Sequence, residues 1–130
     1  MAHAINLLIV DDSERMRRMI KKLIKDVLGE VYECSDGSQA LEAYTEHRPD
    51  WVFMDIEMRD VDGITATQQI VTAFPRARVV IISNYDSDDL RDAAAAAGAV
   101  GYVVKEQLIE LRRLLGASGI WNRSDMKKIT

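Results

Sequence analysis

The segment Trp51-Val-Phe-Met-Asp-Ile-Glu-Met-Arg-Asp-Val-Asp-Gly63 decides the fold. Its first four residues form an uninterrupted apolar run, which is typical of a strand buried on both faces of a sheet. Asp55 follows directly, at the point where the run gives way to polar residues. Open α/β folds place their ligand sites at this carboxyl edge of the sheet. Taken alone, however, Asp55 is equally well explained as the residue that ends the strand.

Four more short apolar runs occur along the chain, and the segments between them have the period of amphipathic helices. The first of these helices is expected from Ser13 to Val27, with Gly29 ending it. Five strands that alternate with five helices predict a parallel sheet covered on both faces, which is the doubly wound α/β class. The other expected strands are 7–10, 31–34, 79–82 and 102–104, and the other expected helices are 38–47, 64–74, 87–97 and 106–115.

The composition is that of one soluble domain. The chain has 130 residues, of which 48% are apolar and 29% are charged. Its net charge of −4 argues against a nucleic-acid-binding surface. Cys34 is the single cysteine, so no internal disulfide can form, and a buried structural thiol is expected. No apolar run is long enough to span a membrane and Met1–Asn6 is no signal peptide, so a cytoplasmic protein is expected.

Polar side chains follow four of the five expected strands. Asp11 and Asp12 follow the first, Asp55 the third, Ser83 the fourth and Lys105 the fifth. In a parallel sheet these ends meet at one edge, where the carboxylates repel one another unless a cation lies among them. Oxygen ligands favour Mg²⁺, while a lysine and a hydroxyl suit a tetrahedral anion. The pattern therefore predicts a site where Mg²⁺ and a phosphoryl group meet on a carboxylate.

Four segments carry a family resemblance: Leu8-Ile-Val-Asp-Asp12, Met54-Asp-Ile-Glu-Met58 with Asp62-Gly63, Val80-Ile-Ile-Ser83, and Gly101-Tyr-Val-Val-Lys105. In this order, at the ends of the appropriate strands, they resemble the receiver domain of bacterial two-component response regulators over residues 5–116. The resemblance implies a flavodoxin-like sheet with strand order 2-1-3-4-5 and a receiver domain over residues 1–116. Residues 117–130 would then be a C-terminal tail or a truncated linker.

The resemblance also implies roles for the residues at the sheet edge. Asp55 would accept a phosphoryl group from a histidine kinase or histidine phosphotransfer protein. Asp11, Asp12 and Asp55 would hold Mg²⁺ together with the backbone carbonyl of Glu57. Lys105 would pair with the phosphoryl oxygens. Such a domain catalyses only its own phosphorylation and dephosphorylation, and it is not an enzyme acting on other substrates.

A second set of residues would convert phosphorylation into a signal. The hydroxyl of Ser83 would move to the phosphoryl group, and Tyr102 would turn inward as it moves. Glu57, Asn84 and Tyr85 flank the path of hydrolytic water and would set the lifetime of the phospho-aspartate. The implied output is altered binding of an output protein or of a second copy, with neither nucleic acid nor a membrane bound by the domain itself.

Two residues depart from the family pattern. Arg59 stands where a proline is usual, so the loop after Asp55 is expected to be looser. Glu106 follows Lys105 where a proline with a cis bond is common. A cis bond without proline costs about 3 kcal/mol, so a trans bond is expected here. A non-proline residue after this lysine resembles receivers that are attached to helix-turn-helix domains.

Three alternatives remain open. Mg²⁺-dependent phosphohydrolases or phosphotransferases of the haloacid-dehalogenase type also use an aspartate nucleophile, and they have a second acid two residues later, where Glu57 lies. No cap domain for a substrate is present, however. The chain could also be the receiver fragment of a DNA-binding transcription factor. A flavodoxin-like cofactor binder would need a phosphate-cradling loop where Asp11 and Asp12 instead repel an anion.

Overall fold

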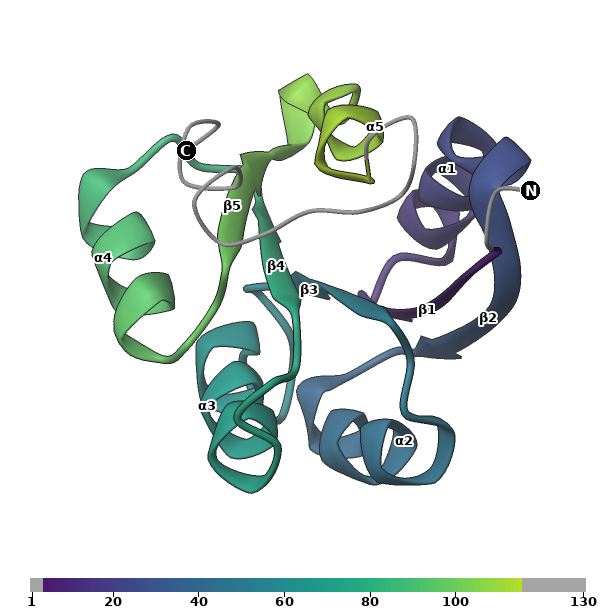
Figure 1. Cartoon of the computed structure of the whole chain (residues 1–130). Helices are drawn as coiled ribbons and strands as arrows, with labels where there is room; N and C mark the ends of the chain where they lie inside the picture. The colour runs from purple at the N-terminus through teal and green to yellow at the C-terminus, as the bar shows by residue number, and fades with distance from the viewer. Residues whose placement is uncertain (1–3, 116–130) are drawn as a thin grey trace.

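The computed structural model describes residues 4–115 and contains one five-stranded sheet. Every neighbouring pair of strands is parallel, and the strand order is β2-β1-β3-β4-β5, which confirms the predicted topology. Figure 1 shows the twisted sheet with helices on both sides. The strands are β1 (Ile5–Val10), β2 (Leu28–Cys34), β3 (Trp51–Asp55), β4 (Val79–Ser83) and β5 (Gly101–Val104).

The helices form two layers. Helices α1 and α5 cover one face of the sheet, where Ile20 and Leu111 are fully buried in its apolar core. Helices α2, α3 and α4 cover the other face, where Ala66, Ile70 and Ala94 are buried. None of the helices within residues 4–115 is both long and apolar enough to cross a lipid bilayer. Their bounds are α1 Glu14–Leu23, α2 Ala40–His47, α3 Gly63–Ala73, α4 Asp88–Ala96 and α5 Glu110–Leu115.

The period of the strands explains which side chains share a face. In β3, Trp51 and Phe53 pack toward α1 and α5, while Val52 and Met54 pack toward the other layer. Asp55 continues this alternation, so its side chain belongs to the α1–α5 side of the sheet edge. The apolar run was continuous in sequence because both faces of the strand are buried.

The region after the first helix differs from the prediction. Helix α1 ends at Leu23, and a 3₁₀ turn over Lys25–Val27 follows it. Gly29, which was predicted to end the helix, lies instead in β2, whose first residue Leu28 pairs with Ile5. An added Cβ at Gly29 would lie 2.7 Å from the side chain of Asn6, so close packing of two strands explains the glycine.

The last helix also begins later than the expected residue 106. A 3₁₀ turn spans Lys105–Gln107, and α5 begins at Glu110. No cis peptide bond occurs among the described residues, so the bond from Lys105 to Glu106 is trans, as expected. Cys34 is buried and free, which agrees with the structural thiol that the sequence predicted. The tail expected at 117–130 lies outside the described residues.

Candidate functional site

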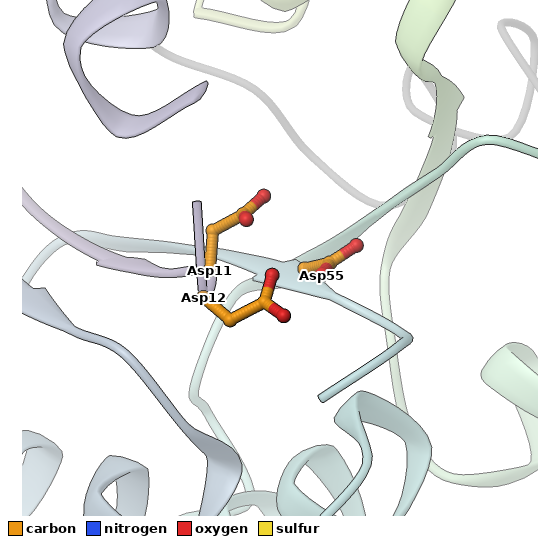
Figure 2. A group of neighbouring side chains, drawn as sticks. All are labelled: Asp11, Asp12 and Asp55. Carbon is orange, nitrogen blue, oxygen red and sulfur yellow. The ribbon is translucent and has the colours of Figure 1, made fainter. Parts of the chain in front are cut away.

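Three carboxylates meet at the carboxyl edge of the sheet. Asp11 and Asp12 follow β1, and Asp55 ends the neighbouring strand β3. One carboxylate oxygen of each lies within 4.8 Å of the others, and Figure 2 shows the three side chains grouped together. Asp11 and Asp55 are only 2% and 4% exposed, while Asp12 is open to solvent. A cluster of oxygen ligands with one open side suits a hard divalent cation that keeps some of its water.

Lys105 joins this cluster from the far side of β4. It follows β5, and its Nζ lies 3.0 Å from Asp55 Oδ1 and 3.3 Å from Asp11 Oδ2. The structure thus brings together the four charged residues that the sequence placed at this edge. One ammonium group among three carboxylates leaves the site with an excess of negative charge, which a bound cation would offset.

Burial and like charge disturb the carboxylates. Burial, together with the charges of Asp11 and Asp12, raises the pKa of Asp55 to about 6 although Lys105 opposes the shift. Burial also raises the pKa of Asp11, against the backbone N–H of Ser13 and the charge of Lys105. Burial alone would lower the pKa of Lys105, but its ion pairs with the two buried aspartates raise it. The lysine therefore stays charged and is the counter-ion of Asp55.

This electrostatic strain predicts a pH dependence of stability. The folded pKa of Asp55, about 6, lies above its ordinary value of 3.8. The native state then binds a proton that the unfolded state releases, so the unfolding free energy falls as pH rises from about 4 to about 6. At about 1.4 kcal/mol per pKa unit the loss is roughly 3 kcal/mol. Urea unfolding of the wild type and Asp55→Asn at pH 4.5 and 7.5, without divalent cations, isolates this contribution. A difference between the two proteins that stays constant with pH would contradict the expected shift.

Ser83 and Tyr102 lie beside the cluster and share one partner. Ser83 ends β4, is buried, and accepts a hydrogen bond at Oγ from the backbone N–H of Tyr85 (3.0 Å). Tyr102 lies in β5, and its hydroxyl donates to the backbone carbonyl of Tyr85 (2.7 Å). Its ring is 4% exposed, so it is already turned inward, and the guanidinium of Arg91 lies 5.0 Å from its centroid. The loop after β4 therefore connects the two predicted switch residues.

The three residues predicted to control water access are all exposed. Glu57 follows β3, and Asn84 and Tyr85 follow β4. A hydrogen bond to the Glu57 carboxylate and its negative charge raise the pKa of the Tyr85 phenol. Glu57 and Tyr85 thus meet across the gap between the two loops. The geometry joins this pair to each other rather than to the buried carboxylates.

Two residues that support the site were not predicted from the sequence. Arg17 of α1 donates from Nη1 to the backbone carbonyl of Asp11 (2.6 Å) and from Nε to Glu33 (3.0 Å). Asp36, in the loop after β2, accepts hydrogen bonds from the backbone of the loop that follows Asp55. Neither carries a distinguishing sequence signal, because Arg17 is one of several basic residues on its helix and Asp36 belongs to an ordinary Ser-Asp-Gly turn.

Comparison with known proteins agrees with this geometry. The family model for the response regulator receiver domain matches residues 7–116. The chain is 44% identical over 106 residues to the chemotaxis protein CheY of Bacillus subtilis, covering 81% of this chain and 87% of that protein. Among solved structures, the response regulator domain of Thermotoga maritima CheB superposes with a TM-score of 0.80 at 28% identity, covering 89% of this chain and 96% of that one.

A second solved structure adds a bound state. CheY in the CheX-CheY-BeF3-Mg complex of Borrelia burgdorferi has a TM-score of 0.75 at 25% identity, covering 97% of this chain and 86% of that one. These matches do not favour the phosphohydrolase or flavodoxin-like alternatives. They agree with the sheet order and with the acidic cluster. The chain belongs to the response regulator receiver domain family and is a CheY-like component of two-component signal transduction.

Proposed function

We propose that Asp55 accepts a phosphoryl group from a histidine kinase or histidine phosphotransfer protein, and that phosphorylation changes the binding of an output partner. The observation that carries this proposal is the position of Asp55. It is a buried carboxylate at a strand end, paired with Lys105 at 3.0 Å and grouped with Asp11 and Asp12. The output partner is another protein or a second copy of the domain.

The donor set fits Mg²⁺. Asp11, Asp12 and Asp55 offer carboxylate oxygens alone, and Asp12 leaves one side open to water. We assign the backbone carbonyl of Glu57 as a further ligand. When bound, Mg²⁺ neutralises negative charge on the transferring phosphoryl group. The bound Mg and BeF3 named for the CheY of Borrelia burgdorferi support the assignment.

The transfer itself requires little from the protein beyond position and charge. A carboxylate oxygen of Asp55 attacks phosphorus, an O–P bond forms, and the P–N bond to the donor imidazole breaks. The imidazole nitrogen keeps the electron pair and later takes a proton from solvent. Lys105 holds Asp55 in its nucleophilic, ionised form, and it then pairs with the phosphoryl oxygens. The domain thereby catalyses only its own phosphorylation and the later hydrolysis.

The switch uses hydrogen bonds that already exist. Ser83 would exchange the N–H of Tyr85 for a phosphoryl oxygen, which frees the backbone of the loop after β4. Tyr102 is tied to the same loop by its hydroxyl, so it follows any loop movement. Because its ring is buried here, the inward turn is complete in this arrangement and the change that remains is at Ser83. Glu57, with Asn84 and Tyr85, lies where it can limit water access and so set the lifetime of the phospho-aspartate.

Labelling with a small phosphoryl donor tests the proposal. Acetyl phosphate with Mg²⁺ should add one phosphoryl group per chain, stable in acid and lost in base, because the product is an acyl phosphate. Chelation of Mg²⁺ with EDTA should prevent the labelling. Intact mass spectrometry before and after base treatment measures both. Equal labelling with and without EDTA, or a label that survives base, would contradict the proposal.

A further inference from the structure

We infer that Asp36 is a positioning residue that fixes the loop after Asp55 and thereby sets the affinity of the site for Mg²⁺. This inference rests on the proposed function of that site. Asp36 is not one of the clustered carboxylates and lies in a different loop, between β2 and α2. Its side chain is aimed at the loop between β3 and α3, which contains Glu57.

Three backbone N–H groups donate to the Asp36 carboxylate. Asp60 donates to Oδ1 at 2.9 Å, Val61 to Oδ2 at 3.2 Å, and Ser38, in its own loop, to Oδ2 at 2.8 Å. The N–H groups of Asp60 and Ser38 lead the causes that hold the pKa of Asp36 well below its usual range. The carboxylate is therefore charged throughout the physiological range and connects two loops that are distant in sequence.

Close backbone contacts reinforce this connection. A Cβ at Gly37 would lie 2.3 Å from the carbonyl oxygen of Val61, so the two loops touch without side chains between them. At the other end of the loop, a Cβ at Gly63 would lie 1.9 Å from the carbonyl oxygen of Asp55, and the N–H of Gly63 donates to Ile56 at 2.8 Å. The loop is closed at Gly63 and anchored near Val61.

Only Glu57, Met58 and Arg59 remain between these fixed points. Arg59 stands where the family resemblance leads to proline, so the backbone there lacks the restraint of a ring. Asp36 supplies a restraint from outside the loop, because it fixes the next two N–H groups. The position of the Glu57 carbonyl relative to Asp55 then depends on a carboxylate that touches neither.

A Mg²⁺ titration followed by backbone amide shifts in ¹⁵N NMR tests the inference. Asp36→Ala should raise the Kd for Mg²⁺ by about tenfold, which is the low end of effects for residues that orient metal ligands. Faster hydrogen exchange at the amides of Asp60 and Val61 should accompany it. Asp36→Asn keeps one acceptor oxygen and presents an N–H to Asp60, so it should have an intermediate Kd.

Asp50→Ala is the matched control. Asp50 also accepts a backbone hydrogen bond, from Asn6 at 2.8 Å, but it precedes β3 and so lies at the opposite edge of the sheet. Its loss should leave the Kd unchanged. A folded Asp36→Ala protein with the wild-type Kd would overturn the inference while the proposed function stands. If the alanine variant does not fold, a wild-type Kd in Asp36→Asn overturns it. A wild type that binds no Mg²⁺ would overturn both.

Discussion

Asp55→Asn should abolish labelling by acetyl phosphate, because an amide oxygen is a poor nucleophile and cannot form the acyl phosphate. The same change should stabilise the fold at pH 7. It removes a negative charge from a site that is 4% exposed and next to two other carboxylates. We expect a gain of roughly 1–3 kcal/mol, equivalent to one or two units of the raised pKa. Intact mass spectrometry measures the first effect and urea unfolding the second.

Asp50→Asn is the control for this prediction, since Asp50 is exposed and precedes the same strand. It should label like the wild type and show no comparable gain in stability. Full labelling of Asp55→Asn would place the nucleophile on another residue. A loss of labelling with a loss of stability would indicate damage to the fold instead of removal of a reactive charge.

Lys105→Met should have the opposite effect on stability. Methionine keeps much of the side-chain length, but it leaves Asp11 and Asp55 without the ammonium group that lies 3.3 and 3.0 Å from them. Breaking a buried ion pair by removing one partner costs about 3–5 kcal/mol. The loss should shrink at pH 5, where Asp55, with its pKa of about 6, is largely protonated. Urea unfolding at pH 5 and pH 7.5 measures the difference.

Labelling of Lys105→Met should fall by about 10²–10³-fold, as when one preorganised donor to developing negative charge is removed. Lys22→Met on α1 is a suitable control, since that lysine is exposed and should change neither property. A Lys105→Met protein that is as stable as the wild type at both pH values would show that the ion pairs do not offset the buried charge.

The sequence predicted the sheet and the four charged residues at its edge for the same reason. Strands buried on both faces appear as continuous apolar runs, and such a run marks its own end, as Val10 does before Asp11 and Met54 before Asp55. Because parallel strands share one carboxyl edge, the ends alone place Asp11, Asp55 and Lys105 together. The 4.8 Å cluster and the ion pairs of Lys105 confirm that they meet.

The connections were less predictable because they depend on distant partners. Gly29 resembles a helix stop locally, but the neighbouring strand requires a glycine there, since a Cβ would meet Asn6 at 2.7 Å. Asp36 resembles a turn residue, and no local pattern shows that its carboxylate accepts from Asp60, 24 residues away. Arg59 suggested a looser loop for the same reason, because the residue that restrains the loop lies outside it.

The most direct test maps the phosphoryl group to its residue. Wild-type protein is labelled with acetyl phosphate and Mg²⁺ and reduced with borohydride, which converts an aspartyl phosphate to homoserine. Peptide mass spectrometry then locates the homoserine. The account predicts conversion at Asp55 alone and none when EDTA is present. Conversion at Asp11 or Asp12, or the absence of homoserine in a protein that did take up phosphate, would contradict it.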